Sequence, residues 1–146
     1  MSALSDVVER ALPRLRDISE TQAGHKPAPE VWSAKQILGH LIDSGVNNHA
    51  CFMHASLEQH VNLPDYAQND WVRLGGYQER TWAEVLALWA AYQLQVARVI
   101  ENLPPESLNY TLSIGGDEPL TLDVLATGYV RHQLHHLAQV WKRAQA

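Results

Sequence analysis

Three histidines near the C-terminal end of the chain have a spacing that suggests metal chemistry. They lie in GYVRHQLHHLAQV, residues 128–140, at positions 132, 135 and 136. If this stretch is helical, His132 and His136 are spaced i,i+4, so their Cβ atoms lie roughly 5–6 Å apart on one face. Two imidazoles so placed can share one ion at Zn–N distances of about 2.0–2.1 Å. His135 with His132 is an i,i+3 alternative, but it directs the site toward solvent.

A third protein ligand is needed, and four other potential ligands can be set aside: His25, His60, Cys51 and His54. The first two have no partner at metal-ligand spacing. Cys51 and His54 share a helix with His40 but lie roughly 16 and 21 Å from it, at 1.5 Å per residue, and so cannot share its ion. His40 has apolar neighbours on both sides in ILGHLIDS. We therefore predict a metal site made by His40, His132 and His136.

Other interpretations of these histidines must be weighed against the metal site. A histidine on an apolar face is usually a buried core residue, and three of eight histidines could share a face by chance. Two further metal sites are excluded by spacing, because the chain has neither the Glu-x-x-His pairs of di-iron bundles nor H-E-x-x-H. A three-histidine site keeps a fourth position open, where an ion can polarise a substrate or lower the pKa of a bound water or thiol.

Three residues on the His40 helix have roles that the sequence leaves open. Asp43, one turn from His40, either accepts a hydrogen bond from its ring or is a solvated charge. Asn47 either lines a pocket or belongs to a wet helix flank. Cys51 is expected to be a small buried hydrophobe rather than a nucleophile, because nothing near it in sequence lowers its pKa. No general base can be identified, so the catalytic residues stay unknown.

Capping residues and apolar periodicity predict four helices, and these helices must position the histidines. The first covers about residues 3–21, with apolar side chains at three- and four-residue intervals. The second runs to about residue 57 from a capping box of Ser33 with Gln36, where Trp32 can pack on Ile37 as a hydrophobic staple. The third opens with a second capping box, Thr81 with Glu84, and stops at the proline pair 104–105. The fourth covers about 121–143.

Two connections between these helices are less regular. Residues 61–80 show neither the helical nor the strand period, and we expect a long loop that acts as a lid or binding segment. Residues 110–122, with GGDEP in their middle, predict a short hairpin or crossover. The expected fold is all-α, a four-helix bundle forming one domain over residues 1–146. Ligand sites in such bundles are usually made by side chains of facing helices.

Composition limits the partners and the location. The chain has 146 residues and a formal net charge of −5, so it lacks the basic surplus that nucleic-acid binding needs. It has no uninterrupted apolar run of about 18 residues and no signal-peptide pattern at its start, so we expect no membrane partner and a cytoplasmic location. The single cysteine allows neither an intrachain disulfide nor a pair of thiolates on zinc.

Two quoted stretches also carry a family resemblance. WSAKQILGHLIDSGVNN, followed later by YVRHQLHHLAQV, resembles the DinB-like family of small bacterial four-helix bundles, and LPDY, GGYQER and LP lie where that family has them. The histidine of the first stretch and the H-x-x-x-H of the second match His40, His132 and His136. In that family these positions bind a divalent metal, commonly nickel or zinc, with water completing the site. The resemblance also implies a homodimer.

The resemblance suggests a function more weakly than it suggests the metal site. Members with assigned activities resemble metal-dependent thiol S-transferases that use bacillithiol or glutathione-like thiols, and mycothiol-dependent maleylpyruvate isomerases, while many have no assigned activity. The leading hypothesis is a metal-dependent thiol transferase or hydrolase, in which a metal-bound thiolate meets a small-molecule electrophile held under residues 61–80. The alternative is a non-catalytic metal-binding or stress-associated module with a structural ion.

Overall fold

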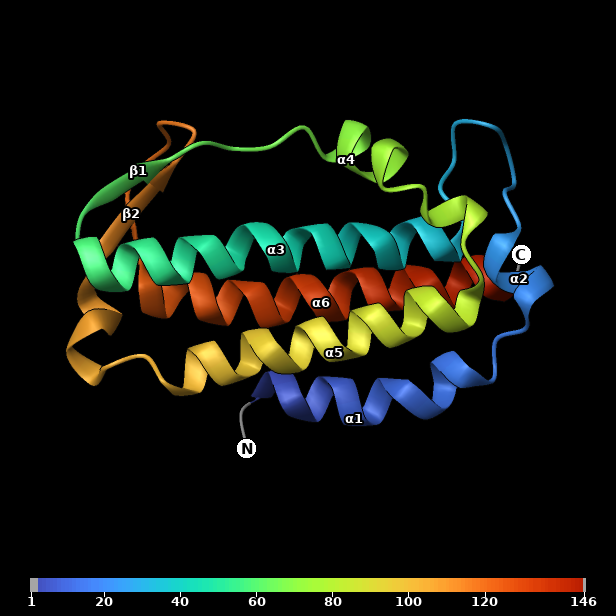
Figure 1. Ribbon diagram of the computed structural model, residues 1–146, viewed down its shortest axis with the longest axis horizontal. Helices are drawn as coiled ribbons and strands as arrows, with labels where there is room; N and C mark the ends of the chain where they lie inside the picture. The colour runs from blue at the N-terminus through green and yellow to red at the C-terminus, as the bar shows by residue number, and fades with distance from the viewer. Residues whose placement is uncertain (1–2, 146) are drawn as a thin grey trace.

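Four long helices run side by side in the computed structural model, which describes residues 3–145 (Figure 1). Helix α3 packs against both α5 and α6, and α1 covers the other side of these two helices. This arrangement confirms the predicted four-helix bundle. The long helices are α1 (Ala3–Arg16), α3 (Ala34–Glu58), α5 (Trp82–Glu101) and α6 (Leu122–Gln145).

Short elements connect the long helices. They are α2 (Glu20–Gly24), β1 (Val61–Leu63), α4 (Gln68–Gly75), β2 (Thr111–Ile114), β3 (Leu120–Thr121) and two 3-10 helices, Tyr77–Glu79 and Pro105–Asn109. The predicted hairpin is confirmed, because β2 and β3 pair antiparallel. Within residues 3–145, none of the helices combines the length and the apolar character that crossing a bilayer requires.

The start of α3 agrees with the predicted capping box. Ser33 Oγ accepts a hydrogen bond from the Gln36 backbone N–H at 3.2 Å, and the Gln36 side chain accepts one from the Ser33 N–H at 3.0 Å. Trp32 packs against the core cluster that contains Ile37. Because the box fixes the first residue of α3, it also fixes the direction in which His40, two turns further on, faces.

Two predictions at other helix ends were wrong in part. The helix predicted over 3–21 ends at Arg16, because Ser19 and Gln22 form a second capping box that starts α2. At α5, Thr81 caps the helix as predicted. The side chain of Glu84, however, pairs with Arg80 at 3.2 Å instead of completing a box.

The long connection predicted over 61–80 is present, but it contains short regular elements that its sequence period did not indicate. Strand β1 lies there and pairs in parallel with β2, which joins this segment to the hairpin. Helix α4 follows, and Gly76, with φ of 68°, ends it in the left-handed conformation that glycine tolerates without strain. The whole segment crosses over α3 on the side away from α1 (Figure 1).

Tyr77 holds the end of this segment on α3. A Cβ atom placed on Gly39 would lie 2.1 Å from the Tyr77 ring, and one on Gly75 would lie 2.7 Å from it, so only glycine leaves room for the ring. The Tyr77 hydroxyl donates a 2.6 Å hydrogen bond to Asp43 Oδ1. Both side chains are buried. This contact fixes the segment one helical turn from His40.

We expect Tyr77→Phe to destabilise the protein by about 1–3 kcal/mol, because the buried Asp43 carboxylate loses its hydrogen-bond donor. Urea unfolding measures the change. Tyr92→Phe is the matched control, because the Tyr92 hydroxyl is hydrogen-bonded to the half-buried His49, at 2.9 Å, and not to a buried carboxylate, and we expect a smaller loss. An equal loss in both variants, or none in Tyr77→Phe, would show that the hydrogen bond to Asp43 adds no extra free energy of unfolding.

Candidate metal centre

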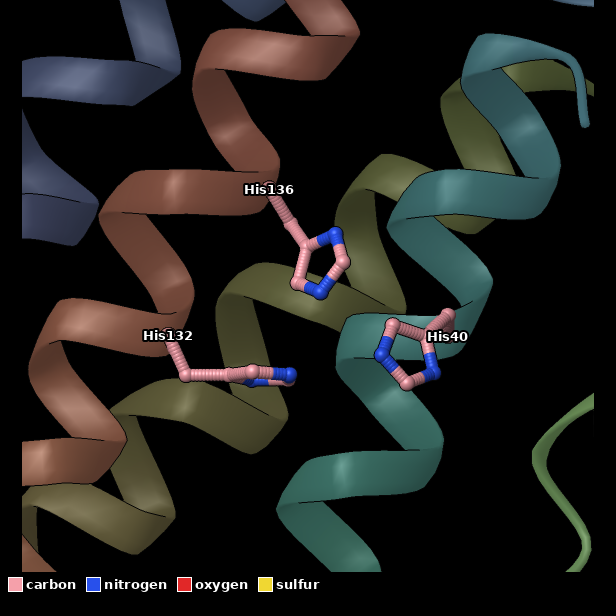
Figure 2. Close-up of side chains that lie close together, drawn as sticks. All are labelled: His40, His132 and His136. Atoms are coloured by element: carbon pink, nitrogen blue, oxygen red, sulfur yellow. The ribbon is translucent and has the colours of Figure 1, made fainter.

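The structure brings the three predicted ligands together. His40 on α3 and His132 and His136 on α6 turn their rings toward one another (Figure 2). One ligand nitrogen of each lies within 4.8 Å of those of the other two. The ring centroids are 5.3 Å apart for His40 and His132, 4.7 Å for His40 and His136, and 4.5 Å for the helical pair.

Hydrogen bonds orient two of the three rings. His136 Nδ1 lies 2.7 Å from Gln139 Oε1. An amide oxygen can only accept, so Nδ1 carries the proton and Nε2 keeps its lone pair. His132 Nδ1 lies 3.5 Å from Ser44 Oγ. Partners of this kind, on the nitrogen that does not bind metal, are typical of metal-ligating histidines. The donor set therefore fits a divalent ion.

Burial keeps the three imidazoles neutral. The pKa of His40 and of His132 is lowered to about 4, mainly by burial and to a lesser extent by the charges of the neighbouring histidines. The pKa of His136 is lowered too, again mainly by burial. At neutral pH all three lone pairs are therefore free for a metal, without competition from protons.

These pKa values predict how the stability of the metal-free protein depends on pH. Unfolded histidines titrate near pH 6.5, so between about pH 6.5 and 4 the unfolded chain binds more protons than the folded one. The free energy of unfolding should therefore fall as the pH is lowered through this range, by a few kcal/mol in order of magnitude. Urea unfolding of chelator-treated protein measures it. His40→Gln should reduce the slope; an identical slope would contradict the assignment to His40.

The other predicted residues have the following positions. His135 is exposed and lies outside the triad, 5.0 Å from the His136 ring centroid. Asp43 is buried rather than solvated, and its hydrogen bond goes to Tyr77 rather than to His40. Cys51 is buried, and burial raises the pKa of its thiol. Asn47 donates to the Asp43 carbonyl at 2.9 Å and borders a cavity.

A cavity of about 550 Å³ opens beside His132. Near the three histidines its wall is polar, with Ser44, Asn47, Asn48, Tyr66 and His132. Further along it is apolar, with side chains from all three strands and the first turn of α6: Leu63, Ile114, Leu120, Val124 and Leu125. Sequence reasoning missed Tyr66 and the strand residues. LPDY contains Leu63 and Tyr66, and the predicted hairpin contains Ile114 and Leu120, but neither stretch indicated that its side chains meet at a cavity.

Family comparison connects this geometry to known proteins. Residues 3–140 match the model of the DinB superfamily. The chain belongs to the DinB superfamily. The match covers both helices that carry the histidines, so the DinB superfamily assignment applies to the whole bundle and agrees with the resemblance in the sequence.

Solved structures of other proteins have the same fold as this DinB superfamily member. YfiT from Bacillus subtilis, described as a probable metal-dependent hydrolase with an unusual four-helix bundle topology, has a TM-score of 0.83 at 20% identity, over 98% of this chain and 82% of its own. A DinB-like protein from the same organism, YjoA, has a TM-score of 0.64 at 16% identity, over 98% and 85%. At these identities the likeness shows the fold alone. No protein of curated function matches this chain.

Proposed function

We propose that this DinB superfamily protein is a metal-dependent enzyme for a small-molecule substrate. His40, His132 and His136 hold one divalent ion in this proposal, and three imidazoles without a thiolate suit nickel or zinc. The observation that carries it is the cavity of about 550 Å³ lined by His132 itself. A purely structural ion has no need of a cavity of ligand size at its edge.

We propose one of two reactions: hydrolysis of the substrate, or transfer of a small thiol to it. A bound ion would supply Lewis acidity, polarising a substrate carbonyl or lowering the pKa of water or thiol. The residues of the chain contribute neutral ligands and an apolar wall that binds the substrate and limits access of water. Cys51 is a poor nucleophile because burial raises its pKa. A thiol nucleophile would therefore come from a low-molecular-weight thiol cosubstrate.

The alternative is a metal-binding module without catalysis. The triad joins α3 to α6, helices that are far apart in sequence, so an ion would hold the bundle together even without a reaction. A cytoplasmic location stays a prediction from the sequence, and a homodimer stays one from the family resemblance.

The test combines metal analysis with turnover. We expect about one ion per chain by elemental analysis after mild purification, because three neutral imidazoles form one site. Nickel- or zinc-loaded protein is then assayed for ester hydrolysis and for transfer of a small thiol to an aryl halide, with metal-free protein as control. Turnover that requires the metal supports the enzyme and distinguishes the two reactions. Bound metal without turnover in either assay favours the structural module, and failure to take up nickel or zinc contradicts both.

A further inference from the structure

A chain of polar contacts runs from the metal centre into the cavity wall. Ser44 Oγ lies 3.5 Å from His132 Nδ1, and it accepts a hydrogen bond from Asn48 Nδ2 at 3.2 Å. The Tyr66 side chain, between β1 and α4, faces Ser44 across the cavity wall and lies close enough for the Ser44 hydroxyl to lower its pKa. All four residues line the cavity. The order of contacts is therefore His132, Ser44, Tyr66.

Metal binding would fix the direction of these hydrogen bonds, a step that rests on the proposed function. With Nε2 of His132 on the ion, its Nδ1 carries a hydrogen and can only donate. A serine hydroxyl has two acceptor lone pairs and one proton. His132 and Asn48 then occupy both lone pairs of Ser44, and the Ser44 proton is left to point at the neighbouring Tyr66 oxygen, the direction in which Ser44 lowers the Tyr66 pKa. The proton of the Tyr66 hydroxyl is left for a ligand in the cavity.

We propose that Tyr66 donates a hydrogen bond to an oxygen of the substrate beside the three histidines. The acceptor we propose is a carbonyl or a carboxylate, because its oxygen can face a Lewis-acidic ion with one lone pair and accept the Tyr66 hydrogen bond with another. The apolar wall formed by the strands and α6 takes the rest of the molecule. The substrate class is therefore a small, mostly apolar compound with a carbonyl or carboxylate at the end that meets the metal centre.

The surroundings of Tyr66 hold it in a position suited to this role. Its ring lies edge-on to Trp71, with centroids 5.2 Å apart and planes at 69°. Its backbone N–H donates to Asp65 Oδ1 at 2.8 Å. Burial, and then the charges of Asp43 and Asp65, raise the pKa of Tyr66 to about 12, so it keeps its proton. A purely packing role would need the ring and not the hydroxyl, and Tyr66→Phe separates the two.

The experiment uses protein loaded with cobalt(II), whose visible absorption reports ligands that enter its coordination sphere. Acetate and hexanoate are titrated as probes. We expect Tyr66→Phe to weaken binding of both by about 10- to 100-fold, the effect of losing one hydrogen bond to a charged group, while its affinity for cobalt stays unchanged. Hexanoate should bind the wild-type protein at least about 10-fold more tightly than acetate, because its tail is buried in the apolar wall.

Tyr92→Phe is the matched control. Its hydroxyl is hydrogen-bonded to His49, outside the cavity, so both probes should bind this variant as they bind the wild type. Equal probe binding in wild type and Tyr66→Phe would overturn the donor role alone. Loss of cobalt affinity in Tyr66→Phe would overturn it in favour of a role in holding His132. Hexanoate binding no tighter than acetate would overturn the apolar substrate class. Absence of any spectral response in cobalt-loaded wild type would show that the ion has no coordination position open to a ligand, and would thus overturn the proposed function itself.

Discussion

His136→Ala is expected to weaken nickel binding by more than about 100-fold, whereas His135→Ala leaves it unchanged. The reason is geometric: His136 offers a nitrogen to the triad, while the exposed His135 lies outside it. Losing an outer partner of a ligand typically costs about 10- to 100-fold, and losing one of three protein ligands should cost more. Calorimetric titration of nickel into the metal-free variants makes the comparison.

His40→Ala should behave like His136→Ala, although it lies on the other helix. His135→Ala and His136→Ala together control for general damage to α6, because each removes one imidazole and the two positions are adjacent on that helix. If His135→Ala proves to be the damaging change and His136→Ala binds nickel normally, the ligand set proposed for α6 is wrong.

Removing the metal is expected to lower the melting temperature by roughly 10 °C. The ligands come from two helices far apart in sequence, so only the folded state assembles the site and binding stabilises it. At a free metal concentration about 1,000 times Kd, binding raises the free energy of unfolding by about 4 kcal/mol. For a domain of this size, 1 kcal/mol shifts the melting temperature by about 2–4 °C. Thermal melts with and without chelator measure the difference.

The His40→Ala variant is the control for the chelator itself. Its midpoint should not respond to chelator, because it has little metal to lose. An unchanged midpoint in wild-type protein shown beforehand to hold metal would rule out a site that joins α3 to α6.

Local signals were enough to predict the bundle and to select the three histidines. The Ser33 capping box and the i,i+4 spacing of His132 and His136 involve residues within one helical turn, so they can be recognised without the fold. Even the break after α1 had a local signal, since Ser19 and Gln22 form a box of the same kind as Ser33 and Gln36. The apolar periodicity nevertheless favoured a first helix that continues past Arg16.

Contacts between distant segments could not be predicted in the same way. Strand β1 is three residues long and is held by pairing with β2, about fifty positions later, so its own sequence shows no strand period. The Tyr77 ring fits on α3 only because Gly39 lacks a side chain, and neither residue indicates the other. The role of Tyr66 likewise depends on Ser44, from another segment of the chain.

The capping box at Ser33 also restricts which length changes the chain can accept. Each residue of an α-helix turns the next by about 100°. A single inserted residue between Ser33 and His40 would leave the cap in place and rotate His40 away from α6, so the site would be lost while the helix remained. Exposed Gly115 and Gly116, in the turn between β2 and β3, can take an insertion without rotating any ligand. Insertions and deletions in natural or engineered relatives should therefore accumulate in that turn and be absent between cap and histidine.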